Sequence, residues 1–248
     1  FMKLFRKTLT CLVVSVLVFS TSACSGKSGI SLARSKEQKD LSECLTLLQK
    51  KKHDKAIQCL ESFKSRHYGQ ASASLADLAM ADAHFDKKDY IVAAEAYQIF
   101  IEANPFSDRL PYAYYKGGLS YLKAAPKAID RDQTYLEDAV RMLETVGRYY
   151  KASSEAQDAQ TAYHEARLRL AKRQFYIGRF YYRYREYLAA APRFQTLVTE
   201  FAGLGLDEKS FYYLIKSLQK TNQKELAVKY LDVFKESFPN SKYVKQLN

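Results

Sequence analysis

The chain has 248 residues, of which 47% are hydrophobic, so it is long enough to bury a sizeable core. With only 9 Gly and 5 Pro, and with abundant Ala, Leu, Lys and Tyr, the composition favours an all-helical protein. The formal net charge is +12, but Lys and Arg are spread along the whole length. Scattered charge is more typical of a solvated surface than of a nucleic-acid-binding stripe.

The start of the chain has the pattern of an export signal. Lys3, Arg6 and Lys7 precede an apolar run over 9–19 that is too short to span a bilayer. Small residues at 21–23 then lead directly to Cys24. The alternatives are a lipoprotein signal and an ordinary secretory signal with an incidental cysteine.

The small residues before Cys24 resemble a bacterial lipobox, whose cysteine is lipidated and becomes the first residue of the mature protein. The resemblance implies a signal peptide over 1–23 and covalent diacylglycerol and N-acyl chains on Cys24, with no other cofactor. Because Ser25 follows the cysteine, the resemblance points to the outer membrane. The Gly/Ser/Lys-rich stretch 24–36 is expected to be a flexible tether.

Two helices are expected next, near 41–50 and 54–66. Cys44 and Cys59 lie almost symmetrically about the turn between them, so antiparallel helices could bring the two sulfur atoms together. An oxidising compartment would then allow a disulfide. Two separate buried thiols are the equal alternative, because helix rotation could point the Cβ atoms apart.

A spacing in the mid-thirties recurs along the chain. Ala56 and Ala93 are 37 positions apart, as are Ala190 and Ala227, and each pair falls at the same place in a helical pattern. Such a period, with a small residue on the second helix, is typical of tetratricopeptide repeats. We therefore expect an all-α tetratricopeptide superhelix over 37–248, with about five repeats, near 37–70, 74–107, 111–154, 171–204 and 208–241.

The third repeat is interrupted between its two helices. An insertion at 125–133 contains Pro126 and the run Asp130, Arg131 and Asp132. Inserted loops on repeat proteins often carry binding functions, so this loop is a candidate contact.

In tetratricopeptide folds, fixed positions of the first helix of each repeat face a concave groove. In the first three repeats these positions are mainly apolar and aromatic, which would suit an extended peptide with an aromatic end. The alternative is that they pack against the protein itself. The groove candidates are Leu41, Leu45, Leu48, Leu78, Phe85, Tyr112, Tyr115, Leu119 and Leu122.

The same positions in the last two repeats are basic and aromatic. Lys and Arg there would suit carboxylates of a partner protein, since Arg can bind them bidentately. The docking candidates are Lys172, Phe175, Arg179, Tyr182, Lys209, Tyr212 and Lys216.

Catalytic and metal-binding patterns are poorly represented. The four His residues are scattered without metal-ligand spacing, and neither a G-x-S-x-G nor a P-loop sequence occurs. We expect a protein that is not an enzyme and holds no metal. A cell-wall enzyme with helical repeats would need a catalytic domain for which no stretch remains.

Several motifs occur in an order that resembles the BamD family, lipoproteins of the machine that inserts β-barrel proteins into the outer membrane. They are the run 115–119, the insertion with Asp130 to Asp132, the run 170–172 and the stretch 178–182. The resemblance covers nearly all of the chain after the signal.

This resemblance implies an outer-membrane protein anchored by lipid at the periplasmic face. Its implied partners are an outer-membrane barrel insertase with periplasmic domains, other assembly lipoproteins and unfolded barrel proteins, and not nucleic acid. Two alternatives remain open: a tetratricopeptide lipoprotein of another envelope system, such as pilus assembly or cell division, and a cytosolic nucleic-acid-binding repeat protein, which would require the export signal to be misassigned.

Overall fold

The computed structural model describes residues 27–247, and all regular secondary structure in that range is helical. The described residues from Asp40 onward form one compact unit, and the part of the first helix before Asp40 belongs to a separate one. The helices are α1 (Lys27–Gln49), α2 (His53–Arg66), α3 (Ala71–Asp86), α4 (Tyr90–Ala103), α5 (Leu110–Ala124), α6 (Thr134–Tyr149), α7 (Ala156–Arg183), α8 (Tyr187–Thr199), α9 (Asp207–Lys220), α10 (Lys224–Ser237) and α11 (Lys242–Lys245).

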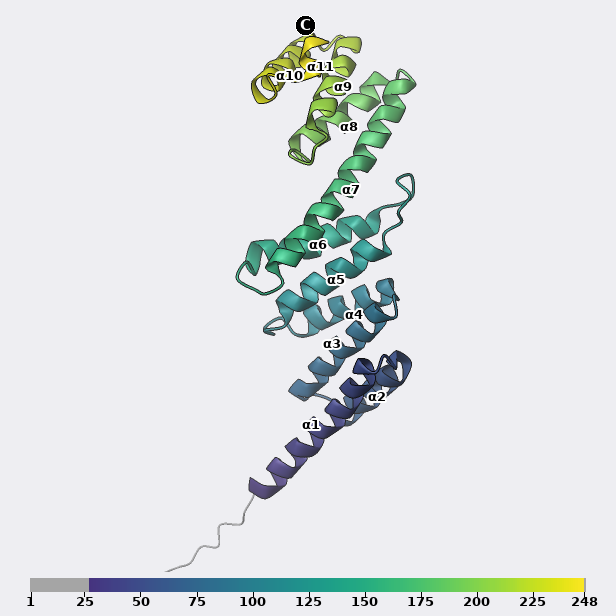
Figure 1. Ribbon diagram of the computed structural model, residues 1–248, viewed down its shortest axis with the longest axis vertical. Helices are drawn as coiled ribbons and strands as arrows, with labels where there is room; N and C mark the ends of the chain where they lie inside the picture. The colour runs from purple at the N-terminus through teal and green to yellow at the C-terminus, as the bar shows by residue number, and fades with distance from the viewer. Residues whose placement is uncertain (1–26, 248) are drawn as a thin grey trace, which may run out of the picture. The chain divides into compact units, whose positions relative to one another are not determined.

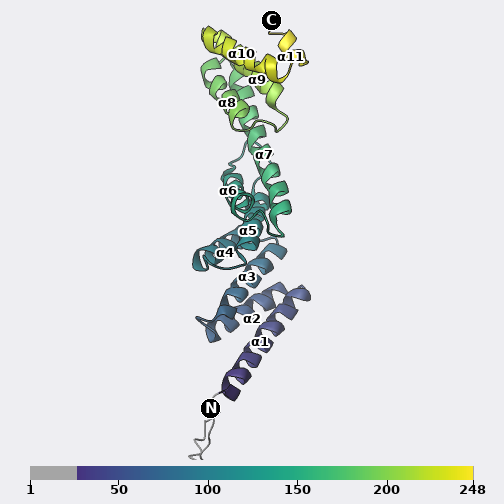
Figure 2. The ribbon, with the colours of Figure 1, turned by 90° about the vertical axis from the view of Figure 1, so that its left-hand side faces the viewer.

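Within the larger unit, each helix packs against the next one along the chain. The contacts run from α2 and α3 through to α9 and α10, and the short α11 packs on α9 and α10 (Figures 1 and 2). The pairs correspond to helix–turn–helix repeats, so the predicted tetratricopeptide architecture is confirmed.

The repeating alanines and the turns explain why this stacking is regular. Ala56, Ala93, Ala190 and Ala227 are all buried, and their small side chains let neighbouring helices approach closely.

The turn between the two helices of a repeat also recurs with a 37-residue spacing. Lys51 and Lys88 have positive φ in the first two repeats, and Arg185 and Asn222 do so in the last two. A left-handed residue at the end of a helix reverses the chain direction tightly. Among the described residues, the third repeat has no such residue, because the insertion 125–133 replaces its short turn.

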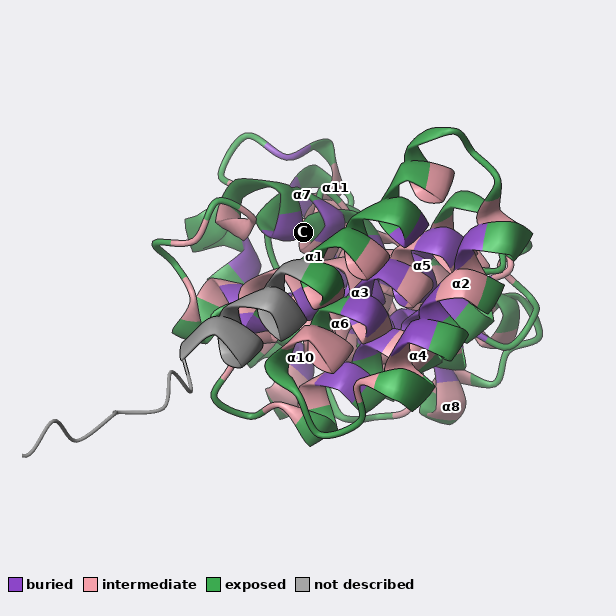
Figure 3. Cartoon of the chain, turned by 90° about the horizontal axis from the view of Figure 1, so that it is seen from below, coloured by how far each residue is buried: buried purple, intermediate pink, exposed green. Residues whose placement is uncertain are grey.

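Buried residues lie between the helices and exposed residues on their outer sides (Figure 3). The long helix α7 contributes to two separate core clusters. Ala159, Ala162 and Ala166 in its first half pack with α5 and α6, whereas Ala171 in its second half packs with α8 and α9. Helix α7 thus covers the third repeat and also begins the fourth.

The predicted tether at 24–36 is wrong for the part that the structure describes, because α1 is already helical from Lys27. Leu32, Ala33, Arg34, Lys36 and Glu37 are good helix formers, and their propensity outweighs the neighbouring Ser and Gly residues. The predicted signal peptide and Cys24 lie outside the described residues. Within the described range, no helix is both long and apolar enough to cross a membrane.

Candidate partner-binding surfaces

Two of the predicted groove residues belong to the core instead. Leu78 is 6% exposed and packs with α4 and α5, and Leu122 is 4% exposed and packs with α6 and α7. Their assignment to an open groove is wrong. The middle of α7 lies against the end of α5, where Arg169 donates a hydrogen bond to the Leu122 carbonyl, and this packing accounts for the burial of Leu122.

The other groove candidates are partly or well exposed. Leu45 is 37% exposed, whereas Leu41 and Leu48 pack partly against the core of the first repeat. Tyr115 and Leu119 are partly buried against the core of the third repeat. The first-repeat and third-repeat groove residues thus leave only part of their apolar surface open to a ligand.

The centre of the predicted groove is polar. The Tyr112 hydroxyl donates a 2.6 Å hydrogen bond to Asp82 Oδ1, and the hydroxyl of the fully buried Tyr97 donates to the same oxygen. Burial raises the pKa of Asp82, although both hydroxyl donors act in the opposite direction. Burial and the nearby Asp82 also raise the pKa of both tyrosines, which keeps them as neutral donors.

Lys116 lies beside this network and was not among the predicted site residues. Its Nζ is 3.5 Å from the centroid of the Phe85 ring, which is cation–π geometry. Lys116 falls one residue after the groove position Tyr115. The fixed groove positions of a tetratricopeptide repeat therefore do not include it. Phe85, a predicted groove residue, therefore has one ring face occupied by a cation.

Five of the seven predicted docking residues of the last repeats gather at one place. The Arg179 guanidinium lies 4.7 Å from the Tyr213 ring centroid, and the Tyr182 ring lies edge-on to the same ring at 4.9 Å. Lys216 Nζ is 6.0 Å from the ring of Tyr212, which contacts Tyr213 edge-on. The structure thus brings Arg179, Tyr182, Tyr212 and Lys216 together on α7 and α9.

Tyr213 is the residue around which this cluster is built, and sequence reasoning missed it. Its ring also contacts those of Phe175 and Phe194. The signal that could have found it is its place in the pair Tyr212-Tyr213, since one of two adjacent helical aromatics must turn toward the core. Lys172 and Lys209 are exposed, and no contact joins them to the cluster within the described chain.

The predicted insertion loop is held by two side chains that sequence reasoning did not select. The buried Gln133 amide nitrogen lies 3.0–3.3 Å from the carbonyl oxygens of Pro126, Ala128 and Arg131. Arg169 of α7 donates to the carbonyls of Leu122, Ala125 and Pro126. The loop is therefore fixed at both its ends, and Asp130, Arg131 and Asp132 are exposed on it.

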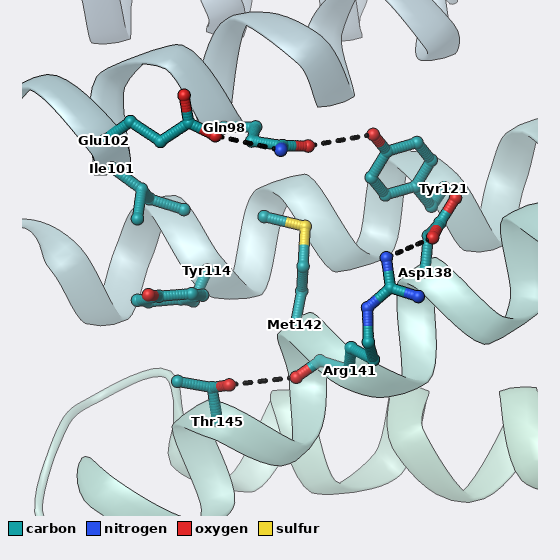
Figure 4. Close-up of a pocket in the computed structure, with 9 residues that line it drawn as sticks. All are labelled: Gln98, Ile101, Glu102, Tyr114, Tyr121, Asp138, Arg141, Met142 and Thr145. Carbon is teal, nitrogen blue, oxygen red and sulfur yellow. Dashed lines mark hydrogen bonds and ion pairs between the residues drawn. The ribbon is translucent and has the colours of Figure 1, made fainter.

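A small cavity of about 260 Å³ lies elsewhere, between α4, α5 and α6. Figure 4 shows Gln98 joining Glu102 to the Tyr121 hydroxyl, while Arg141 pairs with Asp138 on the other side. These five polar side chains are already paired with one another, so we assign the cavity no ligand.

In the first repeat, Cys44 and Cys59 form a disulfide, with their Cα atoms 5.4 Å apart. Of the two alternatives that the sequence left open, the structure has the bonded pair. In the described range, no group of three or more His, Cys, Asp or Glu side chains is placed to hold a metal ion.

Comparison with known proteins places the chain in a family. Residues 35–229 match the YfiO family model, which is described as an outer membrane lipoprotein. The chain belongs to this family. The match includes all the groove, docking and insertion residues discussed above, but not Cys24.

Curated relatives carry the family's other name. "Outer membrane protein assembly factor BamD" of Rickettsia prowazekii is 27% identical over 81% of this chain and 80% of its own length. The BamD proteins of Pasteurella multocida and Neisseria meningitidis are 22% and 25% identical, over 90% and 80% of this chain and 89% and 78% of their own. Among solved structures, the TPR2AB domain of yeast Sti1 in its pHSP90 complex aligns with a TM-score of 0.42 at 15% identity, covering 85% of this chain and 80% of that one.

Proposed function

We propose that this protein is a non-enzymatic scaffold of the outer-membrane β-barrel assembly complex, anchored at the periplasmic face by lipid chains on Cys24. It binds targeting segments of unfolded barrel proteins and docks onto the membrane-embedded insertase through that subunit's periplasmic domains. Family membership and the names of the curated relatives support this assignment. Other assembly lipoproteins are further partners, and nucleic acid is not one.

The observation that carries the docking half of the proposal is the cationic cluster on α7 and α9. Arg179 and Lys216 each lie over a tyrosine ring, so both charges are held in place before a partner arrives. A cation held on an aromatic face loses little further freedom when it pairs with a carboxylate. This arrangement suits acidic side chains on a protein partner.

The test is a binding measurement between the purified chain and the periplasmic domains of the insertase from the same organism. We expect the double variant Arg179→Glu/Lys216→Glu to weaken binding by at least about tenfold, because two attractive pairs become repulsive. The matched control is Lys229→Glu/Lys235→Glu, which makes the same charge change on the exposed side of α10.

The control variant should bind within about threefold of the wild type, since charges outside an interface act mainly at long range. Equal affinities for the two double variants would show that docking does not use the cluster.

A further inference from the structure

Two turns between consecutive repeats each carry an aromatic side chain that stands almost entirely in solvent. Tyr68, in the turn between α2 and α3, is 93% exposed, and Phe106, in the turn between α4 and α5, is 98% exposed. The second turn lies against the start of α3, where Ser74 and the exposed Leu75 line a hollow of about 620 Å³ together with residues 103–109. The two turns therefore lie side by side, and we call Tyr68, Leu75 and Phe106 the aromatic edge.

The exposure of Phe106 does not come from a loose turn. The Asn104 side chain donates a 2.9 Å hydrogen bond to the Phe100 carbonyl, and the Ser107 hydroxyl accepts one of 3.1 Å from the Arg109 amide. The backbone is thus fixed on both sides of the ring. Because the ring contributes almost no buried area to the fold, its apolar surface is available to something outside the chain.

The aromatic side chains at the later turns are less exposed. Tyr149, at the end of α6, is 69% exposed. Phe201, after α8, packs partly against the last core cluster, and the Arg167 guanidinium lies 5.2 Å from its ring centroid. Rings that stand almost wholly in water are therefore a feature of the first two of these turns, the two nearest the start of the chain.

The proposed lipid anchor keeps these turns near a membrane. Sixteen residues lie between Cys24 and the compact unit that begins at Asp40, and an extended chain of that length spans at most about 55 Å. Tethering over such a distance makes even a weak contact with the bilayer frequent. Tyrosine and other aromatic rings favour the membrane–water interface, where they sit at the level of the lipid headgroups.

We propose that the aromatic edge contacts the bilayer surface, with the Tyr68 and Phe106 rings entering the headgroup region. This inference rests on the proposed lipid anchor at Cys24, and it assigns the face of the repeat stack that the membrane meets. The anchor supplies the attachment, and the two rings orient the first repeats on the surface.

The contact is apolar, because charges beside the two rings are paired. Arg66 Nη1 lies 2.7 Å from Asp40 Oδ2, and Arg109 Nε lies 4.0 Å from Asp108 Oδ1. The chain as a whole has a formal net charge of +12, so anionic lipids would attract any part of its surface. Neutral lipid is therefore the probe that is specific to this edge.

The test uses tryptophan as a probe of membrane depth, since the chain contains none of its own. Tyr68→Trp and Phe106→Trp are compared with Phe180→Trp, which replaces an exposed ring of α7 in the fourth repeat. Each variant begins at Cys24, whose thiol is coupled to a maleimide lipid in neutral phosphatidylcholine vesicles. The other two cysteines of that chain are bonded to each other and do not react.

We expect brominated acyl chains to quench the probes at 68 and 106 at least about threefold more strongly than the probe at 180, with a blue shift of their emission. All three replaced rings are exposed, so the variants should have the melting curve of the wild type by circular dichroism. Equal quenching at the three positions, or quenching that requires anionic lipid, would overturn the inference.

Two further outcomes would assign the edge to a protein and overturn the inference. One is a blue shift without vesicles that grows with protein concentration, which indicates a second copy of the chain. The other is a blue shift that needs the periplasmic domains of the insertase and not lipid. The mass of Cys24 in protein purified from envelopes tests the natural lipid separately, and an unmodified cysteine would contradict the anchor and the tethering on which the inference rests.

Discussion

At the scale of single residues, the most informative group is Asp82. It lies at the centre of a predicted groove, yet it serves mainly as the shared acceptor for the hydroxyls of Tyr97 and Tyr112. Burial disfavours its charged form, whereas the two hydrogen bonds favour it, and the balance raises its pKa. Charge and hydrogen-bond acceptance can be separated here by two substitutions.

Asp82→Asn keeps an acceptor oxygen and removes the charge. Between the ordinary pKa of 3.8 and the raised folded value, folded wild-type protein binds more protons than unfolded protein, so its stability falls as pH rises through that window. The Asn variant lacks this loss, so its stability relative to wild type should increase as pH rises from about 4 to 7. Urea unfolding followed by circular dichroism at both pH values measures this.

Asp82→Ala is the comparison for the same measurement. It leaves the Tyr97 hydroxyl buried without an acceptor, so we expect a loss of about 1–3 kcal/mol in the free energy of unfolding at both pH values. If the Asn variant were as unstable as the Ala variant, the charge of Asp82 and not its hydrogen bonds would hold the groove together.

At the scale of elements, close packing of α5 on α6 depends on two adjacent glycines. A Cβ added at Gly118 would lie 2.6 Å from Leu143 Cγ, a branched atom inside a packed core. A Cβ added at Gly117 would lie 2.5 Å from Met142 Cε, the end of a flexible side chain that can move aside.

Gly118→Ala should therefore destabilise the protein by about 1–3 kcal/mol, because the core cannot shift without strain. Gly117→Ala should stay within about 1 kcal/mol of wild type, since the gain in helix propensity offsets the displacement of Met142 and a smaller shift near Tyr97. Urea unfolding of the two variants measures this difference. Their midpoints can be compared directly if the slope of the unfolding free energy against urea concentration is the same for both. The opposite order would mean that α5 and α6 are not packed as described.

Local sequence patterns predicted the repeats and the insertion that interrupts the third one, but they did not predict how neighbouring helices cover individual side chains. The alanine spacing and the insertion at 125–133 follow from local patterns, and the structure has them where expected. Leu122 was misplaced because the middle of α7 packs against the end of α5, which no pattern within α5 reveals. Lys116 and Tyr213 were missed because a positional rule for the groove assumes that each repeat has the same helix rotation.

At the scale of the whole molecule, the larger unit has two chemically different surfaces on one stack of helices. The Lys116–Phe85 pair joins the second and third repeats, and the Arg179 cluster belongs to the fourth and fifth. Helix α7 is shared by the two core clusters between them, so the surfaces sit on a continuous scaffold. Two surfaces on different repeats of one scaffold would let a protein hold two partners at a fixed distance from each other.

The most direct test of this account is affinity capture from mildly solubilised envelopes, using the chain with its natural N-terminal segment and a tag after Asn248. We predict co-purification of a large outer-membrane barrel protein with periplasmic domains, and its loss in the Arg179→Glu/Lys216→Glu variant but not in Lys229→Glu/Lys235→Glu. Recovery of pilus or cell-division proteins alone, with no such barrel protein, would contradict the assignment to barrel assembly.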